Sequence, residues 1–220
     1  GLLGGEAQKL DALTTGPLGP LMAKATTYAM AALETNASMG RIVAAPTAGA
    51  CGVIPGVLLA CQDVYGFTDE QLRDALANAA AIGYLITRNA SVSGAEGGCQ
   101  AEVGSASAMA ASAVAELFGG TPRQCLDAAG NASMGLMGLV CDPIAGLVEV
   151  PCQKRNATGA ANALVSAQIA LAGIGNFVNF DETIDAQRRV GASLPFELRE
   201  SALGGIAATP TACSFCAGCK

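Results

Sequence analysis

The 220-residue chain contains no histidine and no tryptophan. Without an imidazole group, neither a histidine acid or base nor a mixed His/Cys zinc site can form within this chain. Nine cysteines are present, however, so cysteine chemistry remains. The options are a disulfide, a thiolate nucleophile, or thiolate ligands for zinc or an iron–sulfur cluster.

Other absences narrow the class of protein. The chain has no run of Lys or Arg and a net charge of −6, which argues against nucleic-acid binding. It does not open on a charged segment followed by an apolar one, as a secretory signal does. The odd cysteine count in a chain that is 51% hydrophobic disfavours a disulfide framework. We therefore expect a reduced, cytoplasmic protein, and Gly1 in place of methionine indicates a fragment or a processed product.

Two uncharged stretches, residues 42–61 and 156–180, are long enough to span a membrane. The first is interrupted by prolines and glycines, and the second carries several Asn and Gln side chains. Neither stretch is flanked by a Trp/Tyr belt or by a Lys/Arg-rich loop. We predict that both are buried segments and that the protein has no membrane partner.

The sequence predicts an all-α fold, a compact bundle of helices rich in small residues. Residues 68–71 and 121–124 have the form of capping boxes, and helical spacing of apolar residues follows the first. A further helix is predicted over 100–117, and Asp181 and Ser193 are predicted to cap two short helices. We expect one all-helical domain over residues 1–211 and a cysteine-rich tail over 212–220.

A short internal similarity accompanies this pattern. Asn36–Gly40 and Asn131–Gly135 have the same sequence, and each is followed by a Pro-x-Ala-Gly turn, Pro46–Gly49 and Pro143–Gly146. In an alanine-rich chain this similarity could arise by chance. It could also reflect a pseudo-repeat whose turns face each other across a central site, where backbone N–H groups hold a carboxylate or cluster sulfides.

Six of the cysteines divide by sequence context. Cys99, Cys141 and Cys152 lie in turns rich in Gly and Pro. Cys61 and Cys125 lie in helical segments and are expected to be buried packing residues. Cys51 is expected to pack close to the turn at residues 46–49.

Three long segments resemble the bacterial iron–sulfur L-serine dehydratases. Glu34–Gly56 resembles the substrate-site signature of that family, and Gly94–Gly104 and Cys141–Asn156 resemble its two cluster segments. The resemblance runs from Gly1 to Thr211 and is to the alpha chain, or to the catalytic domain of single-chain forms. The separate beta domain of that family is not present in this sequence.

The resemblance implies a [4Fe-4S] cluster held by Cys99, Cys141 and Cys152 at the centre of the helical bundle. Three protein ligands for four irons leave one iron open to act as a Lewis acid on the serine hydroxyl. It further implies conversion of L-serine to pyruvate and ammonia without pyridoxal phosphate, a role in amino-acid degradation and gluconeogenesis, a beta chain or beta domain as partner, and an oligomer. The alternatives are an L-cysteine desulfidase or L-threonine deaminase on the same scaffold, or a non-catalytic iron–sulfur or thiol redox sensor.

A substrate amino acid needs a carboxylate clamp and hydrogen-bond donors. Arg155 is the candidate clamp, because guanidinium matches carboxylate in a bidentate manner; the alternative is an ordinary surface salt bridge. The candidate substrate-binding donors, some of which could instead be helix caps, are Thr47, Gly49, Ala50, Ser38, Asn36, Asn131 and Ser133. The general base is unassigned, and Lys24 is a weak candidate that would need desolvation.

The tail sequence Cys213-x-x-Cys216-x-x-Cys219 leaves three interpretations open. The tail could bind its own metal. It could be a set of free or oxidised thiols. Alternatively, Cys219 could reach the open iron when substrate is absent, in which case truncation after Thr211 would leave the cluster assembled but more sensitive to oxygen.

Overall fold

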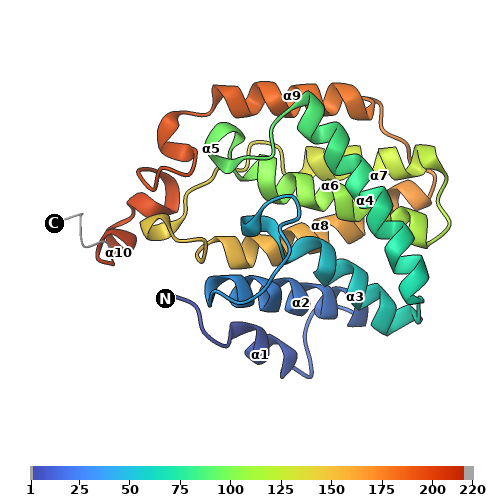
Figure 1. Cartoon of the computed structure of the whole chain (residues 1–220), viewed down its shortest axis with the longest axis horizontal. Helices are drawn as coiled ribbons and strands as arrows, with labels where there is room; N and C mark the ends of the chain where they lie inside the picture. Colours follow the sequence, from blue (N-terminus) through green and yellow to red (C-terminus); the bar gives the residue numbers. More distant parts are fainter. Residues whose placement is uncertain (1, 216–220) are drawn as a thin grey trace.

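The computed structural model describes residues 2–215, and within them it contains helices but no β-strand (Figure 1). The all-α prediction is confirmed. The α-helices are α1 (Glu6–Asp11), α2 (Pro20–Ala37), α3 (Val53–Tyr65), α4 (Asp69–Asn89), α5 (Gly94–Gly97), α6 (Ser105–Leu117), α7 (Pro122–Gly135), α8 (Cys152–Leu171), α9 (Phe180–Ser193) and α10 (Pro210–Cys213). A π-helical turn, η2 (Gln100–Gly104), and four short 3₁₀ helices, η1 (Ala48–Ala50), η3 (Ile144–Gly146), η4 (Phe196–Leu198) and η5 (Gly205–Ala208), lie between them.

The helix starts follow local sequence chemistry. Both predicted capping boxes form, at Thr68 and Thr121, each with its side chain accepting from a backbone N–H in the first turn. The prediction for the last long helix was wrong, because α9 is one helix that is capped by Asn179 and ends at Ser193. Asp181 lies in the first turn of α9, where a negative charge complements the helix dipole.

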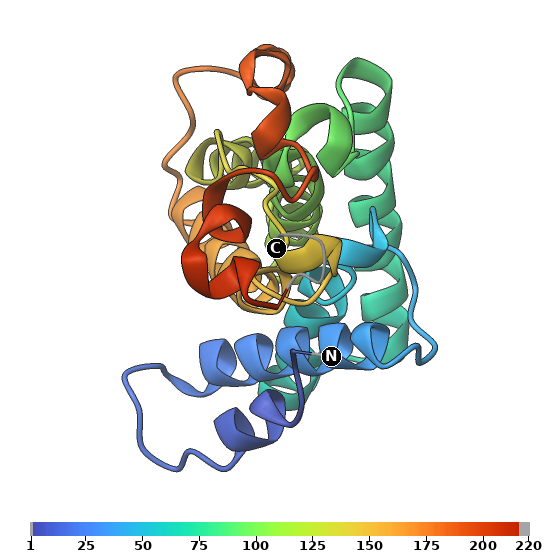
Figure 2. The same cartoon turned by 90° about the vertical axis from the view of Figure 1, so that its left-hand side faces the viewer.

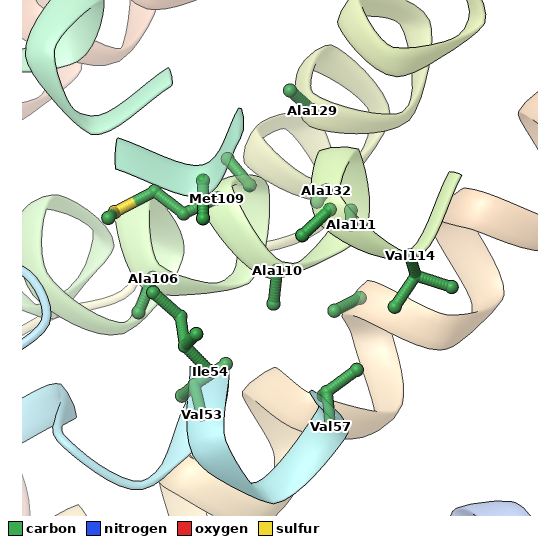
Figure 3. Close-up of a cluster of buried hydrophobic side chains, with 14 of the residues drawn as sticks. Val53, Ile54, Val57, Ala106, Met109, Ala110, Ala111, Val114, Ala129 and Ala132 are labelled. Carbon is green, nitrogen blue, oxygen red and sulfur yellow. The ribbon is translucent and has the colours of Figure 1, made fainter. Parts of the chain in front are cut away.

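Helix α6 forms the centre of the bundle, and every residue from Ser105 to Ala115 is buried. It packs against α3, α4, α7 and α8 through small side chains, as Figure 3 shows around Ala110 and Ala111. A side chain at Gly56 of α3 would lie 2.8 Å from the backbone nitrogen of Ala29 in α2. Glycine and alanine therefore let these helix backbones approach one another closely.

One apolar stretch, residues 48–65, is long enough to cross a membrane by length and composition. More than half of it, 56%, is buried inside the protein. It comprises η1 and α3, and α3 packs against α2, α6 and α8. The prediction of a buried segment over residues 42–61 therefore holds for the part from Ala50 onward, whereas residues 42–49 are not buried and Val43 is 80% exposed.

The two identical pentapeptides adopt different structures. Asn36–Gly40 ends α2, and Met39 there has a left-handed backbone with φ of 61°. Asn131–Gly135 stays helical to the end of α7. Only the following turns are alike, because each Pro-x-Ala-Gly segment enters a short 3₁₀ helix. The pentapeptides themselves therefore give no sign of a structural pseudo-repeat.

The segments that carry the predicted site gather at one end of the bundle, which faces the viewer in Figure 2. There η1 precedes α3, η2 precedes α6, and Cys152 begins α8; η1, η2 and α8 contact one another. The N-terminal ends of three core helices thus converge, and their partial positive charges favour anions. The domain boundary predicted at residue 211 falls within α10.

Candidate functional site

Cys99, Cys141 and Cys152, the loop cysteines, come together at this end of the bundle. All three are buried and free, with 3%, 4% and 8% of their surfaces exposed. Burial raises the pKa of Cys99 and of Cys152 to about 12, and the Glu102 carboxylate adds to both shifts. The pKa of Cys141 is raised furthest, by burial first and then by the charges of Glu102 and Cys99. Metal binding would have to displace the thiol protons, which makes it pH-dependent.

Glu102 connects these cysteines to the turn that contains Thr47. It lies on the π-helical turn η2, three residues after Cys99. Its Oε1 accepts a hydrogen bond from Thr47 Oγ1 at 2.8 Å, and its Oε2 lies 3.6 Å from Cys141 Sγ. Burial, followed by the charge of Glu200, raises the pKa of Glu102 above its usual value. A Cβ at Gly94 would lie 2.6 Å from Glu102 Oε2, so only glycine leaves room for the carboxylate there.

Asn156 fixes the Thr47 turn against α8. It is fully buried one turn after Cys152, and its Nδ2 donates to the carbonyls of Gly49 (2.8 Å) and Cys152 (2.9 Å). Its Oδ1 accepts from the N–H of Gly52 at 2.9 Å. A single amide therefore satisfies three backbone groups and sets the position of η1 relative to Cys152.

Arg155 joins the other two loops. Its Nη1 donates to the carbonyl of Val140 at 2.8 Å and to Asp142 Oδ1 at 2.7 Å, on either side of Cys141. Asp142 Oδ2 accepts from the N–H of Ile206, which ties the C-terminal segment to the same loop. The ion pair is mostly buried, with 16% of the Arg155 side chain exposed, so it differs from an ordinary surface salt bridge.

Comparison with known proteins identifies the family. A family model described as the serine dehydratase alpha chain matches residues 1–207. The chain belongs to the serine dehydratase alpha chain family. It is 52% identical over 214 residues to the probable L-serine dehydratase, alpha chain, of Bacillus subtilis, which covers 96% of this chain and 71% of that protein. It is 50% identical to the L-serine dehydratase, alpha chain, of Peptoniphilus asaccharolyticus over 88% of this chain and 66% of the relative.

A longer member of the family is also similar. The L-serine dehydratase of Streptomyces coelicolor is 46% identical over 86% of this chain, yet this chain covers only 42% of that protein. Some members of the family thus carry a matching part within a polypeptide more than twice as long. The resemblance that the sequence motifs indicate is confirmed.

The donor set of this chain fits an iron–sulfur cluster. Three thiols lie close enough for the charge of one to raise the pKa of another, in a buried end of the fold lined by glycine turns and helix N-termini. Soft thiolates are the ligands that iron–sulfur clusters take. The missing Cβ of Gly94 opens space beside Cys141 Sγ, since a Cβ there would lie 3.0 Å away.

The structure places the predicted substrate-binding residues of the first motif around one turn. Thr47 contacts Glu102, and Gly49 accepts from Asn156. Asn36 Nδ2 donates to the carbonyl of Ala48 at 3.2 Å, so it holds the same turn. The predicted N–H donor of Ala50 is used within the turn, because it bonds to the carbonyl of Thr47. Ser38 bonds back to the carbonyl of Thr35 and ends α2.

The other predicted residues lie elsewhere. Asn131 and Ser133 are on α7, which packs against α6, α8 and α9, and the Ser133 hydroxyl is buried without a hydrogen-bond partner in the described part of the chain. Lys24 Nζ binds Asp63 at 3.1 Å and is about half exposed. Asp63 is in the last turn of α3, whereas the Thr47 turn precedes the first, so Lys24 lies at the opposite end of α3 and its position gives no support to a role as base.

The remaining cysteines are also free where the structure describes them. Cys61 and Cys125 are buried in the core, as predicted, and Cys51 is buried against Leu33 and Cys152. Cys213 ends α10 and is half-buried. Cys216 and Cys219 lie outside the described residues, so the predictions for the tail stay predictions.

Sequence reasoning missed Glu102, Asn156 and Glu200 as site residues. The sequence contained a signal for two of them. Glu102 follows Cys99 by three residues and Asn156 follows Cys152 by four, so on a helix each lies on the same face as its cysteine. Glu200 carried none. It reaches the site only because an isolated bridge pairs Cys141 with Arg199.

Proposed function

We propose that this chain is the catalytic chain of an enzyme that eliminates water from L-serine and releases pyruvate and ammonia. Family membership supports the proposal, as do the names of the relatives in Bacillus and Peptoniphilus. The structural observation that carries it is the contact of one carboxylate, Glu102, with both the Thr47 turn and Cys141. The turn that resembles a substrate site therefore adjoins the thiols that resemble cluster ligands.

In this proposal Cys99, Cys141 and Cys152 would hold a [4Fe-4S] cluster. Such a cluster, with one iron free of protein ligands, supplies a Lewis acid for the substrate hydroxyl. Pyridoxal phosphate has no part in the proposal. The same cluster on a sensor would not require a substrate-like turn beside it, which is why we favour an enzyme.

The chain's own residues would bind and orient the substrate. The converging N-termini of α3, α6 and α8 favour the substrate carboxylate. Thr47 and Gly49 would line the site, with Asn156 holding the backbone of their turn in place. Arg155 would act mainly by holding the Cys141 and Cys152 segments together, because Asp142 already occupies one of its nitrogens.

The designation of the relatives as alpha chains supports a second, beta chain as partner. With no histidine in this chain, that partner is the place where we expect the missing acid–base group. An oligomer in the cytoplasm is part of the same proposal.

Anaerobic reconstitution with iron and sulfide tests the proposal. We expect iron and sulfide to bind to the full chain, the absorption of the cluster to change on addition of L-serine, and pyruvate to form when the beta chain is present. L-Threonine and L-cysteine, tested in parallel, distinguish the related activities. Cys125→Ser serves as the matched control, because it removes a buried thiol outside the site.

Two results would contradict the proposal. Failure of the intact chain to bind iron, with all three loop cysteines open to alkylation, would remove the cluster assignment. A cluster that forms, but whose absorption does not change with any of the three amino acids and that yields no product in the presence of the beta chain, would favour a sensor.

A further inference from the structure

Three ligand groups of different kinds meet at the exposed edge of the site. A carboxylate oxygen of Glu102, the Sγ of Cys141 and a carboxylate oxygen of Glu200 all lie within 4.8 Å of one another. Glu102 is partly buried, Cys141 is buried and Glu200 is exposed, so the group has a path to solvent.

The spacing of these atoms suits one metal ion. In a tetrahedral zinc site with Zn–S of about 2.3 Å and Zn–O of about 2.0 Å, a sulfur and an oxygen on the same ion lie about 3.5 Å apart. The Glu102 Oε2 to Cys141 Sγ distance is 3.6 Å. Ligands on separate irons of a cluster lie farther apart, since irons and sulfides stand between them.

The surrounding chain holds each ligand in place. The second oxygen of Glu102 accepts from Thr47, which leaves Oε2 directed toward Cys141. Cys141 donates its N–H to the carbonyl of Leu198 at 2.9 Å, and its carbonyl accepts from the N–H of Glu200 at 2.7 Å. The backbones of Cys141 and Glu200 are therefore joined directly, which keeps the two residues side by side.

Neither Glu102 nor Glu200 forms an ion pair among the described residues, although their carboxylates lie within 4.8 Å of each other. Arg155, three residues after Cys152, is paired with Asp142. A bound cation would relieve this repulsion between like charges.

We propose that Glu102, Cys141 and Glu200 bind a single divalent transition-metal ion, Zn²⁺ or Fe²⁺. On binding, the metal–sulfur bond replaces the S–H bond of Cys141, the proton passes to solvent, and no electron is transferred. Because Cys141 is shared, this mononuclear site and the cluster of the proposed function exclude each other. Binding of the ion itself does not depend on the proposed function.

Cobalt(II) is the probe for this site, because its thiolate bonds and its coordination geometry are visible in absorption. The measurement uses the cluster-free full chain with Cys213, Cys216 and Cys219 replaced by serine, which removes the competing thiols of the tail. We expect one Co²⁺ per chain with the charge-transfer intensity of one thiolate. Cys141→Ser should abolish this band, and Glu102→Gln and Glu200→Gln should each weaken binding by about 10-fold or more.

Glu197→Gln is the matched control, because Glu197 is an exposed carboxylate three residues before Glu200 that is not a member of the group. It should leave Co²⁺ affinity unchanged, and circular dichroism checks that every variant is folded. Equal loss of the band in Cys99→Ser, Cys152→Ser and Cys141→Ser would overturn the proposal in favour of a three-thiol site. Unchanged affinity in both glutamine variants would overturn it as well.

A competition experiment adds a second readout. Zn²⁺ bound beforehand should slow the appearance of cluster absorption during reconstitution, and Glu200→Gln should relieve that delay. If Zn²⁺ delays reconstitution equally in wild type and Glu200→Gln, the carboxylates are not ligands of the inhibiting ion.

Discussion

The loop cysteines differ in their surroundings from the core cysteines, Cys61 and Cys125. Cys61 is as deeply buried as Cys99, and burial alone raises the pKa of Cys61 to about 12. Cys61 lies within α3, and no charged group contributes to its pKa shift. Cys99, Cys141 and Cys152 instead lie near one another and near Glu102, with Cys99 and Cys152 at the starts of helices and Cys141 in a loop. Burial therefore does not distinguish a ligand, whereas convergence with other ligating groups does.

Replacement of a loop cysteine tests this comparison most severely. Cys99→Ser, Cys141→Ser or Cys152→Ser should each lower iron binding and serine dehydration by more than about 100-fold, because loss of even an outer-shell partner costs about 10–100-fold. The folded state should survive, since serine is nearly isosteric with cysteine. Iron content and pyruvate formation after anaerobic reconstitution measure the effect. A serine variant that retains the full iron content would remove that cysteine from the ligand set.

Replacement of a core cysteine should have the opposite profile. Cys61→Ser should lower the free energy of unfolding by about 1–3 kcal/mol, because it buries a hydroxyl in an apolar environment. Iron content per folded chain should stay the same. Urea denaturation of the cluster-free chain measures the difference.

Cys125→Ser is the control for Cys61→Ser. The polar side chains of Asn78 and Ser112 lie near the Cys125 thiol and oppose the rise that burial causes in its pKa, so a serine there has polar neighbours and should cost less. An equal loss of stability in the two variants would show that the surroundings of the thiol do not decide the cost.

Glu102 gives a pH-dependent test of the site in the metal-free chain. Burial raises the pKa of Glu102 in the folded state above the value of 4.5 for the free side chain. The folded chain then binds more protons than the unfolded chain between the two pKa values, so stability falls as pH rises through that window. Glu102→Gln should therefore raise the melting temperature at pH 7, and its advantage should vanish below about pH 4.5.

The glutamine in Glu102→Gln can still accept the hydrogen bond from Thr47, so the two proteins differ in the charge at this position and not in that hydrogen bond. A chelator keeps adventitious metal out of the measurement. An advantage of Glu102→Gln that is equal at both pH values would mean that ionisation of this carboxyl does not oppose folding.

Lys24 should give the smallest effect. Its partner Asp63 comes ten residues after the first residue of α3, Val53, which at 1.5 Å per residue is about 15 Å along the helix. As an exposed ion pair, it should contribute little to stability. Lys24→Ala should leave pyruvate formation unchanged, and a large loss of activity with normal iron content would restore Lys24 as a catalytic candidate.

Local signals in the sequence accounted for much of the fold. The capping boxes at Thr68 and Thr121 predicted two helix starts, because a cap involves residues only three apart. The start of α9 was misassigned, since Asn179 and Asp181 are both acceptable caps and the choice depends on how the preceding loop enters the helix. The central place of α6 could not be read from its sequence, because an alanine-rich helix has no marked apolar face.

The sequence by itself determined the helical class, the absence of imidazole chemistry and the three cysteines whose turns match a family. These properties depend on residue type and on neighbours a few positions apart. Only the tertiary structure decided that Glu102 connects the Thr47 turn to Cys141, that Asn156 holds η1 against α8, and that Glu200 reaches the site. Those contacts join segments from 55 to 107 residues apart, or depend on an isolated backbone bridge. Packing of the whole chain, and no local preference, brings such groups together.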